Sequence, residues 1–287
     1  MRWIGRLALL SLTATVVTWG SVATAGAARR SVPGSPAANV PSGYAIETTM
    51  ITVSADTQTQ GKAMCPTKDV VLGGGVLIVS DNLNADVNSS WPTNARTWAV
   101  NVNNGDSAPS NVTIYAVCAH KPTGYQQVKT ATIANPAGEQ TRQIADCPAG
   151  KDVLGGGGHS TSSSLAVAES SSLPGKTTTP TRFAWGVGEN NESASAAKMF
   201  TVAICGKPSG YKLINGSFTT DVGDTLQQAT VTCPSGTVPL GGGVDSGMAT
   251  TGVNINTTEP SNTGWIAYEA NSTSSDVLIR ASVTCAS

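Results

Sequence analysis

Apolar and polar residues alternate with a period of two in the segments that end each third of the chain. In NVTIYAVC, the alternate positions from Val112 to Cys118 form one small, apolar face, and the segments 199–205 and 277–285 alternate in the same way. This period is typical of half-buried β-strands. The face opposite the cysteine is apolar in the first two segments and mostly polar in the third. The pattern therefore predicts that the strand at 277–285 borders solvent.

Segments that contain tryptophan predict a second kind of strand. TWAVNVN places Trp98, Val100 and Val102 on one face, and YAIETTMITVSA, from Tyr44, begins another strand. No segment carries a sustained apolar stripe of helical period, and 191–199 comes nearest. The sequence therefore predicts an all-β protein, with about five or six strands in each third.

The chain contains three internal repeats. Each has a Gly-Tyr pair, a Cys-Pro pair, a leucine seven residues after that cysteine, three glycines, a tryptophan, and a closing cysteine twenty residues after the tryptophan. The glycines are Gly73, Gly74, Gly75, Gly155, Gly156, Gly157, Gly241, Gly242 and Gly243, and the tryptophans are Trp98, Trp185 and Trp265. The block from Cys to the glycines and the block from Trp to the closing Cys keep fixed lengths, whereas the stretch between leucine and tryptophan varies from 25 to 31 positions. Such a pattern is typical of strands in fixed register joined by one variable surface loop.

The repeats divide the chain into three β units, at 43–122, 123–208 and 209–287. Residues 28–42 are rich in Pro, Ser and Ala and read as a flexible lead-in. Residues 1–27 combine two arginines, a short apolar stretch and A-x-A cleavage patterns, which is typical of a secretory signal peptide. The sequence therefore predicts a secreted, extracellular protein with no membrane span after removal of the signal.

Export makes the six cysteines interpretable, since an even number in a secreted chain indicates disulfides. Each unit has one early and one late cysteine, so the economical pairing is Cys65–Cys118, Cys147–Cys205 and Cys233–Cys285. Pairing between units is the alternative, and it would break the equivalence of the repeats. Each bridge within a unit would stabilise a thin core by about 4 kcal/mol in the chain-entropy account.

Three consecutive glycines inside a strand need a physical reason, because glycine weakens a strand interior. A phosphate-binding loop would need a following Lys-Ser or Lys-Thr and a helix, whereas Val-Leu-Ile-Val follows Gly75. Glycine in a strand marks a bulge or a close approach by another group. We expect each triplet to be the floor on which the tryptophan of its own unit lies, or a bulge that bends the sheet toward it, and we expect those tryptophans to be core residues.

Catalytic chemistry has little support in the sequence. His120 and His159 occupy non-equivalent positions, and we expect both to be exposed loop residues. Paired cysteines cannot be nucleophiles, and the serines lack a recognisable nucleophile motif. We predict no catalytic, cofactor-binding or metal-binding residues, and hence a non-enzymatic protein without cofactors.

A few polar and aromatic residues are candidates for contact with a partner. Trp91 occurs in one unit only, beside a proline in the variable stretch, and is a candidate for an exposed ligand contact. Asn104, Asn191 and Asn271 follow the tryptophan strands, where we expect them to form turns; hydrogen bonding to sugars is the alternative. The net charge is −1, with 17 basic and 18 acidic residues, so no basic field indicates a nucleic-acid partner.

The pattern CPxGxxxLGGG followed by YAVCA resembles uncharacterised secreted proteins of actinobacteria, and it is similar to a module of conjugative pilus-tip adhesins. The three copies, each with a Cys-Pro opening and a closing cysteine, also look like the β-prism of vitelline membrane outer layer proteins. That resemblance implies three units packed as a pseudo-threefold β-prism-like body. Three tandem β-sandwich domains are the alternative.

Three functions remain in competition at this stage. The first is a non-enzymatic binding or adhesion protein whose variable stretches, 77–97, 159–184 and 245–264, meet a glycan or another cell-surface partner. The second is a structural protein of the cell envelope or extracellular matrix with no small ligand. An enzyme or enzyme inhibitor is the third and has the least support.

Overall fold

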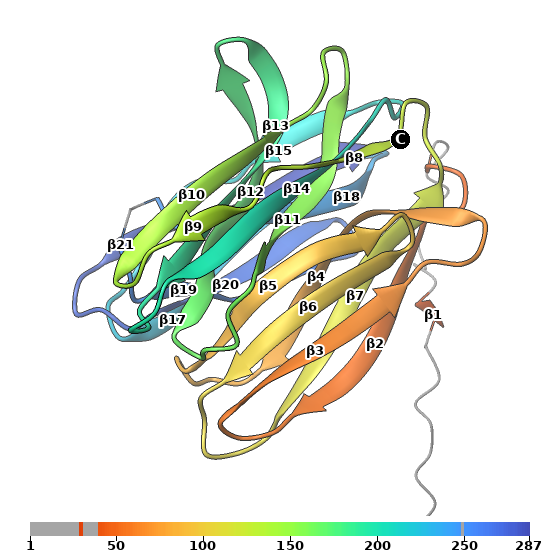
Figure 1. Cartoon of the computed structure of the whole chain (residues 1–287). Coiled ribbons are helices and arrows are strands. Elements are labelled where there is room, and N and C mark those ends of the chain that lie inside the picture. The colour runs from red at the N-terminus through yellow and green to blue at the C-terminus, as the bar shows by residue number, and fades with distance from the viewer. Residues whose placement is uncertain (1–28, 31–39, 248–249) are drawn as a thin grey trace, which may run out of the picture.

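The structure is a computed structural model that describes residues 29–30, 40–247 and 250–287. The signal peptide expected at 1–27 lies outside these residues. The described chain consists of strands and turns without a helix, which confirms the all-β prediction (Figure 1). In the part of the chain that is described, no helix could cross a membrane.

The strands form three sheets, here called A, B and C. Sheet A has the order β1-β2-β7-β4-β19-β20-β17. Its strands are β1 (Arg29–Arg30), β2 (Ala45–Val53), β4 (Asp69–Val79), β7 (Ser110–His120), β17 (Thr225–Thr232), β19 (Val253–Pro260) and β20 (Gly264–Asn271). The short β1 pairs with β2, so part of the lead-in expected to be flexible adds a strand to the edge of this sheet.

Sheet B has the order β3-β6-β5-β11-β14-β8, with β9 also paired to β14. Its strands are β3 (Thr57–Met64), β5 (Ala85–Asn94), β6 (Thr97–Asn104), β8 (Gln126–Lys129), β9 (Ile133–Asn135), β11 (Asp152–Ser160) and β14 (Ala197–Gly206). Sheet C has the order β10-β13-β12-β18-β21-β15, with β16 also paired to β21. Its strands are β10 (Glu139–Asp146), β12 (Val167–Thr178), β13 (Thr181–Asn191), β15 (Lys212–Asn215), β16 (Thr219–Asp221), β18 (Val238–Asp245) and β21 (Val277–Ala286).

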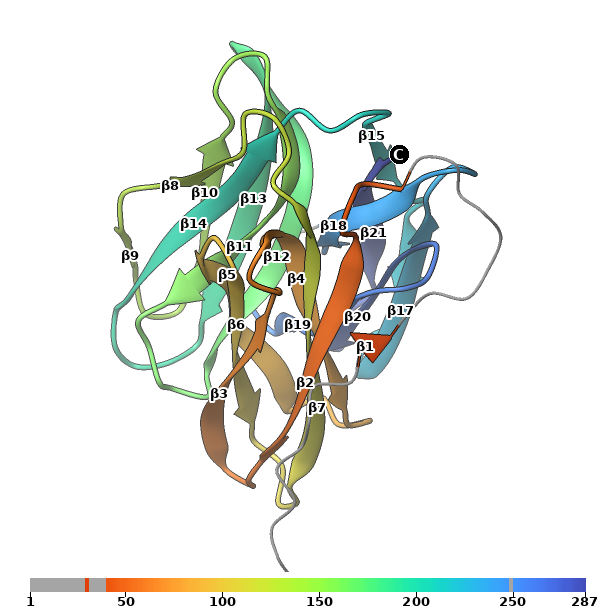
Figure 2. The ribbon, with the colours of Figure 1, turned by 90° about the vertical axis from the view of Figure 1, so that its right-hand side faces the viewer.

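Each repeat unit is divided between two sheets, and each sheet joins two units. The junctions are antiparallel pairings of a glycine strand with the hairpin strand of another unit: Val76↔Thr258, Ser90↔Gly158 and Ser172↔Val244. Separate sandwich domains would instead confine each sheet to one unit. Figure 2 shows the glycine strands β4, β11 and β18 gathered in the middle of the body. Leu72, Leu154 and Leu240 belong to one buried cluster there, so the units share a core.

The glycine triplets explain how three strands can meet so closely. A Cβ on the first glycine of a triplet would lie 2.3–2.6 Å from a carbonyl oxygen of another unit's glycine strand: Gly73 faces Leu240, Gly155 faces Leu72 and Gly241 faces Leu154. A Cβ on the second glycine would collide with the tryptophan of the same unit, and one on the third with the hairpin strand of the neighbouring unit. A β-bulge also interrupts the register just before each triplet, at Val71/Gly73, Val153/Gly155 and Pro239/Gly241. The sequence predicted that each triplet would either lie under the tryptophan of its own unit or form a bulge, and the structure has both features.

The disulfides are Cys65–Cys118, Cys147–Cys205 and Cys233–Cys285, with Cα–Cα distances of 5.6–5.8 Å. This is the pairing within units that the repeat suggests, and it leaves no free cysteine in the described chain. Each bridge ties the turn before a glycine strand to the closing strand that pairs with that glycine strand.

The stretches 77–97, 159–184 and 245–264 are mostly strands rather than loops, because they contain β5, β12 and β19. Their variable length had suggested loops. Many of their polar residues are buried at the junctions, where they have hydrogen-bond partners: Ser90, Ser172 and Thr258 accept hydrogen bonds from Trp98, Trp185 and Trp265. Only the tips of the hairpins remain as variable turns.

The expectation that the strand at 277–285 borders solvent is right for one half of β21 and wrong for the other. Leu278 is exposed and Arg280 is half-buried, but Ser282 and Thr284 are fully buried. β21 is an inner strand of sheet C, and the glycine strand of the second unit lies against its polar face at Thr284. Thr284 donates to the carbonyl oxygens of Leu154 and Gly241, which offsets the cost of burying its hydroxyl.

Candidate functional site

The repeat tryptophans are core residues. Trp98, Trp185 and Trp265 are at most 1% exposed, and each indole Nε1 donates at 2.7–3.0 Å to a hydroxyl on the paired hairpin strand. Their ring faces lie against the second glycine of the triplets. They therefore do not offer a surface to a ligand.

Trp91 is buried as well, at 7% exposed, which overturns its expected role as an exposed contact. It lies next to the Ser90↔Gly158 junction, so the neighbouring unit covers it. Its ring and the His159 ring form a T-shaped pair, with centroids 4.4 Å apart, and His159 stacks on Phe200 at 4.9 Å. The Lys129 ammonium lies 3.5 Å from the Phe200 centroid and covers the end of this stack.

The two histidines differ from each other. His120 is exposed, as expected, and hydrogen bonds to the buried Asp69. His159 lies in strand β11 and is half-buried, so the expectation of an exposed loop residue is wrong for it. Burial and the nearby Lys129 charge lower the pKa of His159. In the described chain, no group of three or more His, Cys, Asp and Glu residues is placed to hold a metal ion.

The three repeat asparagines hold turns, and all are fully buried. They are Asn104, Asn191 and Asn271. In each of them the side-chain oxygen accepts a hydrogen bond from the backbone N–H two residues later, and Nδ2 donates one to the backbone carbonyl four residues later. This is the turn role expected for them. Their burial leaves no free amide for a sugar.

Buried acidic groups are a feature that the sequence reasoning missed. Four residues after the repeat tryptophans stand Val102, Glu189 and Glu269. Each has a counterpart elsewhere in its unit, namely the residue whose backbone carbonyl accepts a hydrogen bond from the buried turn asparagine. These counterparts are Val53, Asn135 and Asp221, respectively. The alternation could have revealed these acids, because both glutamates fall on the tryptophan face of their strands.

The equivalent pairs have three different chemistries. In the first unit the equivalent residues are two fully buried valines, and in the second Asn135 Nδ2 donates to Glu189 Oε1 at 2.8 Å. In the third, Asp221 and Glu269 are both fully buried, and their four carboxyl oxygens have no hydrogen-bond partner. Burial raises the pKa of Asp221 to about 7, and burial together with the nearby Asp221 raises the pKa of Glu269 well above its usual range.

The junction between the second and third units differs from the other two. Tyr44 and Tyr125 donate their hydroxyls across their junctions to the carbonyls of Pro239 and Val71, at 2.8 and 2.9 Å. The equivalent Tyr211 hydroxyl is buried and has no hydrogen-bond partner. The Tyr211 ring instead lies edge-on against Phe183, with centroids 5.2 Å apart.

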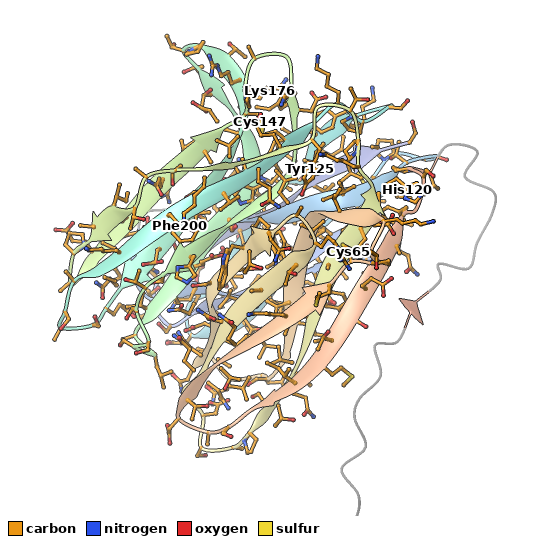
Figure 3. All side chains as sticks on the ribbon, turned by 45° about the vertical axis from the view of Figure 1, so that its right-hand side comes forward. Cys65, His120, Tyr125, Cys147, Lys176 and Phe200 are labelled. Carbon is orange, nitrogen blue, oxygen red and sulfur yellow. A yellow bond between two sulfur atoms is a disulfide. The ribbon has the colours of Figure 1, made fainter. Side chains whose placement is uncertain are left out.

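Phe183 belongs to a hairpin that is longer than its counterparts. The β12–β13 pairing extends from Pro174↔Trp185 to Thr178↔Thr181, whereas β19–β20 ends at Pro260↔Trp265. Figure 1 shows the tip of this hairpin projecting beyond the sheets. Figure 3 places Lys176, on the hairpin, beside Cys147 at the same end of the molecule. The extra length of the second repeat is therefore located in this tip.

Two adjoining hollows flank the hairpin, and we call them together the Phe183 groove. One, of about 400 Å³, lies between the hairpin and β15 and is lined by Lys176, Phe183, Tyr211 and Lys212, among others. The other, also about 400 Å³, lies against the Cys147 turn and shares Lys176 and Phe183 with the first. Lys151, Arg182 and Asp152 also line this second hollow. The lining thus holds four cations and one carboxylate, in a chain whose net charge is −1.

The equivalent places at the other junctions are smaller or filled. Between the third and first units the hollow measures about 210 Å³, and Asn262 and Glu259 line it instead of lysines. Between the first and second units, Gln127 Nε2 donates to the Asn94 carbonyl and to the Tyr125 hydroxyl, at 3.0 and 3.1 Å, and so bridges the two sides. The open, basic groove is thus a specialisation of one junction. The sequence signal that could have located it is the longer second stretch, with its added Lys176 and Arg182.

No protein-family model matches the chain, and no curated protein matches it either.

Proposed function

We propose that the chain is a secreted, non-enzymatic binding or adhesion protein that recognises surface glycans. The three disulfides fit the oxidising environment that the signal peptide predicts. The cyclic sharing of three sheets supports a pseudo-threefold, β-prism-like scaffold. The resemblance of the repeat pattern to a module of pilus-tip adhesins supports the adhesion role.

The Phe183 groove is the observation that carries the proposal. A rigid scaffold that presents a variable hairpin is a common arrangement for binding sites, and hollows of this size are typical of ligand sites. The second variable stretch, 159–184, includes the hairpin. The first and third stretches fold into buried junction strands with short tips, so we assign recognition to the second alone.

A glycan array on the full chain tests this function. The informative variant replaces Gly175–Ala184 with Ser-Asn-Thr-Gly, the tip of the third unit's hairpin, which removes Lys176, Arg182 and Phe183 and leaves the Pro174↔Trp185 pair and the junction strands in place. We expect binding by the unaltered chain and its loss in the variant, with the thermal transition unchanged. Absence of binding across surface polysaccharides would contradict the proposal. It would favour the alternative of a structural protein of the cell envelope or extracellular matrix.

A further inference from the structure

We infer that the Phe183 groove takes an acidic glycan, a sugar chain that carries carboxylate or phosphate groups. This inference rests on the proposed glycan binding and adds the chemical class of the ligand. It follows from three features of the groove: its charge, its unused donor and its contrast with the equivalent places at the other junctions.

The charge of the groove is positive in both hollows. Lys176 lies between them, and Lys212 and Arg182 stand on either side of it. Asp152 is the one carboxylate of the lining. Burial raises its pKa overall, whereas the positive charges of Lys176 and Lys207 favour its ionised form. A planar guanidinium and several ammonium groups in one small groove match carboxylate and phosphate groups, through charge-assisted hydrogen bonds.

The unused donor is the Tyr211 hydroxyl. Burial and the nearby Asp152 charge raise the pKa of Tyr211, so this hydroxyl keeps its proton and remains a donor. Its counterparts Tyr44 and Tyr125 both donate to backbone carbonyls. A buried hydroxyl without a partner is costly, and the ring that carries it lines the groove beside Lys176 and Lys212.

Comparison with the equivalent hollow at another junction indicates that the positive charge is specific to the Phe183 groove. At the third-to-first junction, Asn262 takes the place of Lys176 and Glu259 adds a negative charge. The size of the groove favours a few sugar rings over nucleic acid, because nucleic-acid binding depends on cations that follow a backbone over many phosphates.

Titration calorimetry with the full chain tests this inference. The probes are oligogalacturonate for carboxylates, phosphomannan for phosphates, neutral dextran, and an oligothymidylate as the nucleic-acid probe. The test variant combines Lys176→Gln, Arg182→Gln and Lys212→Gln. The matched control combines Lys62→Gln, Lys68→Gln and Lys198→Gln, which removes the same charge from exposed sites outside the groove.

We expect one or both acidic glycans to bind, and the groove variant to weaken that binding by at least about tenfold while the control changes it less than about twofold. Added salt should weaken binding by the unaltered chain more than by the groove variant. Equal weakening in both variants, or tighter binding of oligothymidylate, would overturn the inference. Binding of dextran alone would overturn it and leave glycan recognition standing, whereas failure of every glycan would overturn both.

Discussion

The indole of Trp98 lies directly on the α-carbon of Gly74, and a Cβ built at Gly74 would come 2.4 Å from both Cγ and Cδ2 of the ring. The same relationship joins Gly156 to Trp185 and Gly242 to Trp265. Each of these glycines lowers the intrinsic strand preference of its segment. It is nevertheless required, because the flat ring of a buried tryptophan occupies the volume where a side chain would start.

Gly74→Val should therefore unfold the chain or destabilise it by about 3 kcal/mol or more, since neither the buried ring nor the paired strand can move away. The measurement is chemical denaturation of the purified protein. Gly186→Ala is the control, because it also lies in a strand and a Cβ there meets nothing within 4 Å. A Gly74→Val protein as stable as the control, but deficient in binding, would show that the triplet has a binding role.

The two tyrosines Tyr125 and Tyr211 provide a second test. Tyr125→Phe removes the hydrogen bond to the Val71 carbonyl and should cost about 1 kcal/mol of folding free energy. Tyr211→Phe removes a buried hydroxyl that has no partner, so stability should stay the same or rise. Denaturant titration of both variants measures the difference. A loss of stability in Tyr211→Phe equal to that in Tyr125→Phe would contradict the assignment of an unused donor.

Removing one disulfide tests whether the units share one core. Replacing Cys147 and Cys205 with alanine should destabilise the chain by up to about 4 kcal/mol, as loop-closure entropy suggests. Because sheets B and C join the second unit to both others, calorimetry should show one transition at a lower temperature. Two transitions, with one at the original temperature, would instead indicate units that fold separately.

The acid pair of the third unit predicts the dependence of stability on pH. The folded pKa of Asp221, about 7, and that of Glu269 lie above the usual carboxyl values near 4, so the folded chain binds protons more tightly than the unfolded chain. The contribution to stability is complete below about pH 4 and is lost as the pH rises through 7. Asp245 and Asp276 add to the repulsion.

Asp221→Asn should flatten this dependence, because it recreates the amide–carboxyl pair of Asn135 and Glu189. Near pH 8 the variant should be more stable than the parent chain by about 1–2 kcal/mol. The reciprocal change Asn135→Asp should steepen the dependence. Some slope will remain in both variants, because burial also raises the pKa of Asp86 to about 8 and that of Glu169. Urea titrations at several pH values measure the slopes, and identical slopes in all three chains would contradict the prediction.

Particular residues show where reasoning from the sequence failed. Trp91 seemed an exposed contact because it stands beside a proline in a polar stretch, but the neighbouring unit covers it. Ser282 and Thr284 seemed to face solvent, but both are buried: Ser282 donates to Asn215 within sheet C, and Thr284 donates to the Leu154 carbonyl of the second unit. In each case a polar or variable local sequence concealed a contact with a distant part of the chain.

The sequence by itself determined the all-β class and the places of the rigid strands, because alternation and fixed spacing record local geometry. Its three equivalent pairs of cysteines also suggested the pairing that the structure has. Only the tertiary structure decided that every sheet is shared by two units, that each glycine of a triplet meets a different neighbour, and that one junction opens into a basic groove. Those features depend on contacts between residues far apart in the chain, such as Tyr211 with Phe183 or Gly73 with Leu240, and no local pattern encodes such contacts.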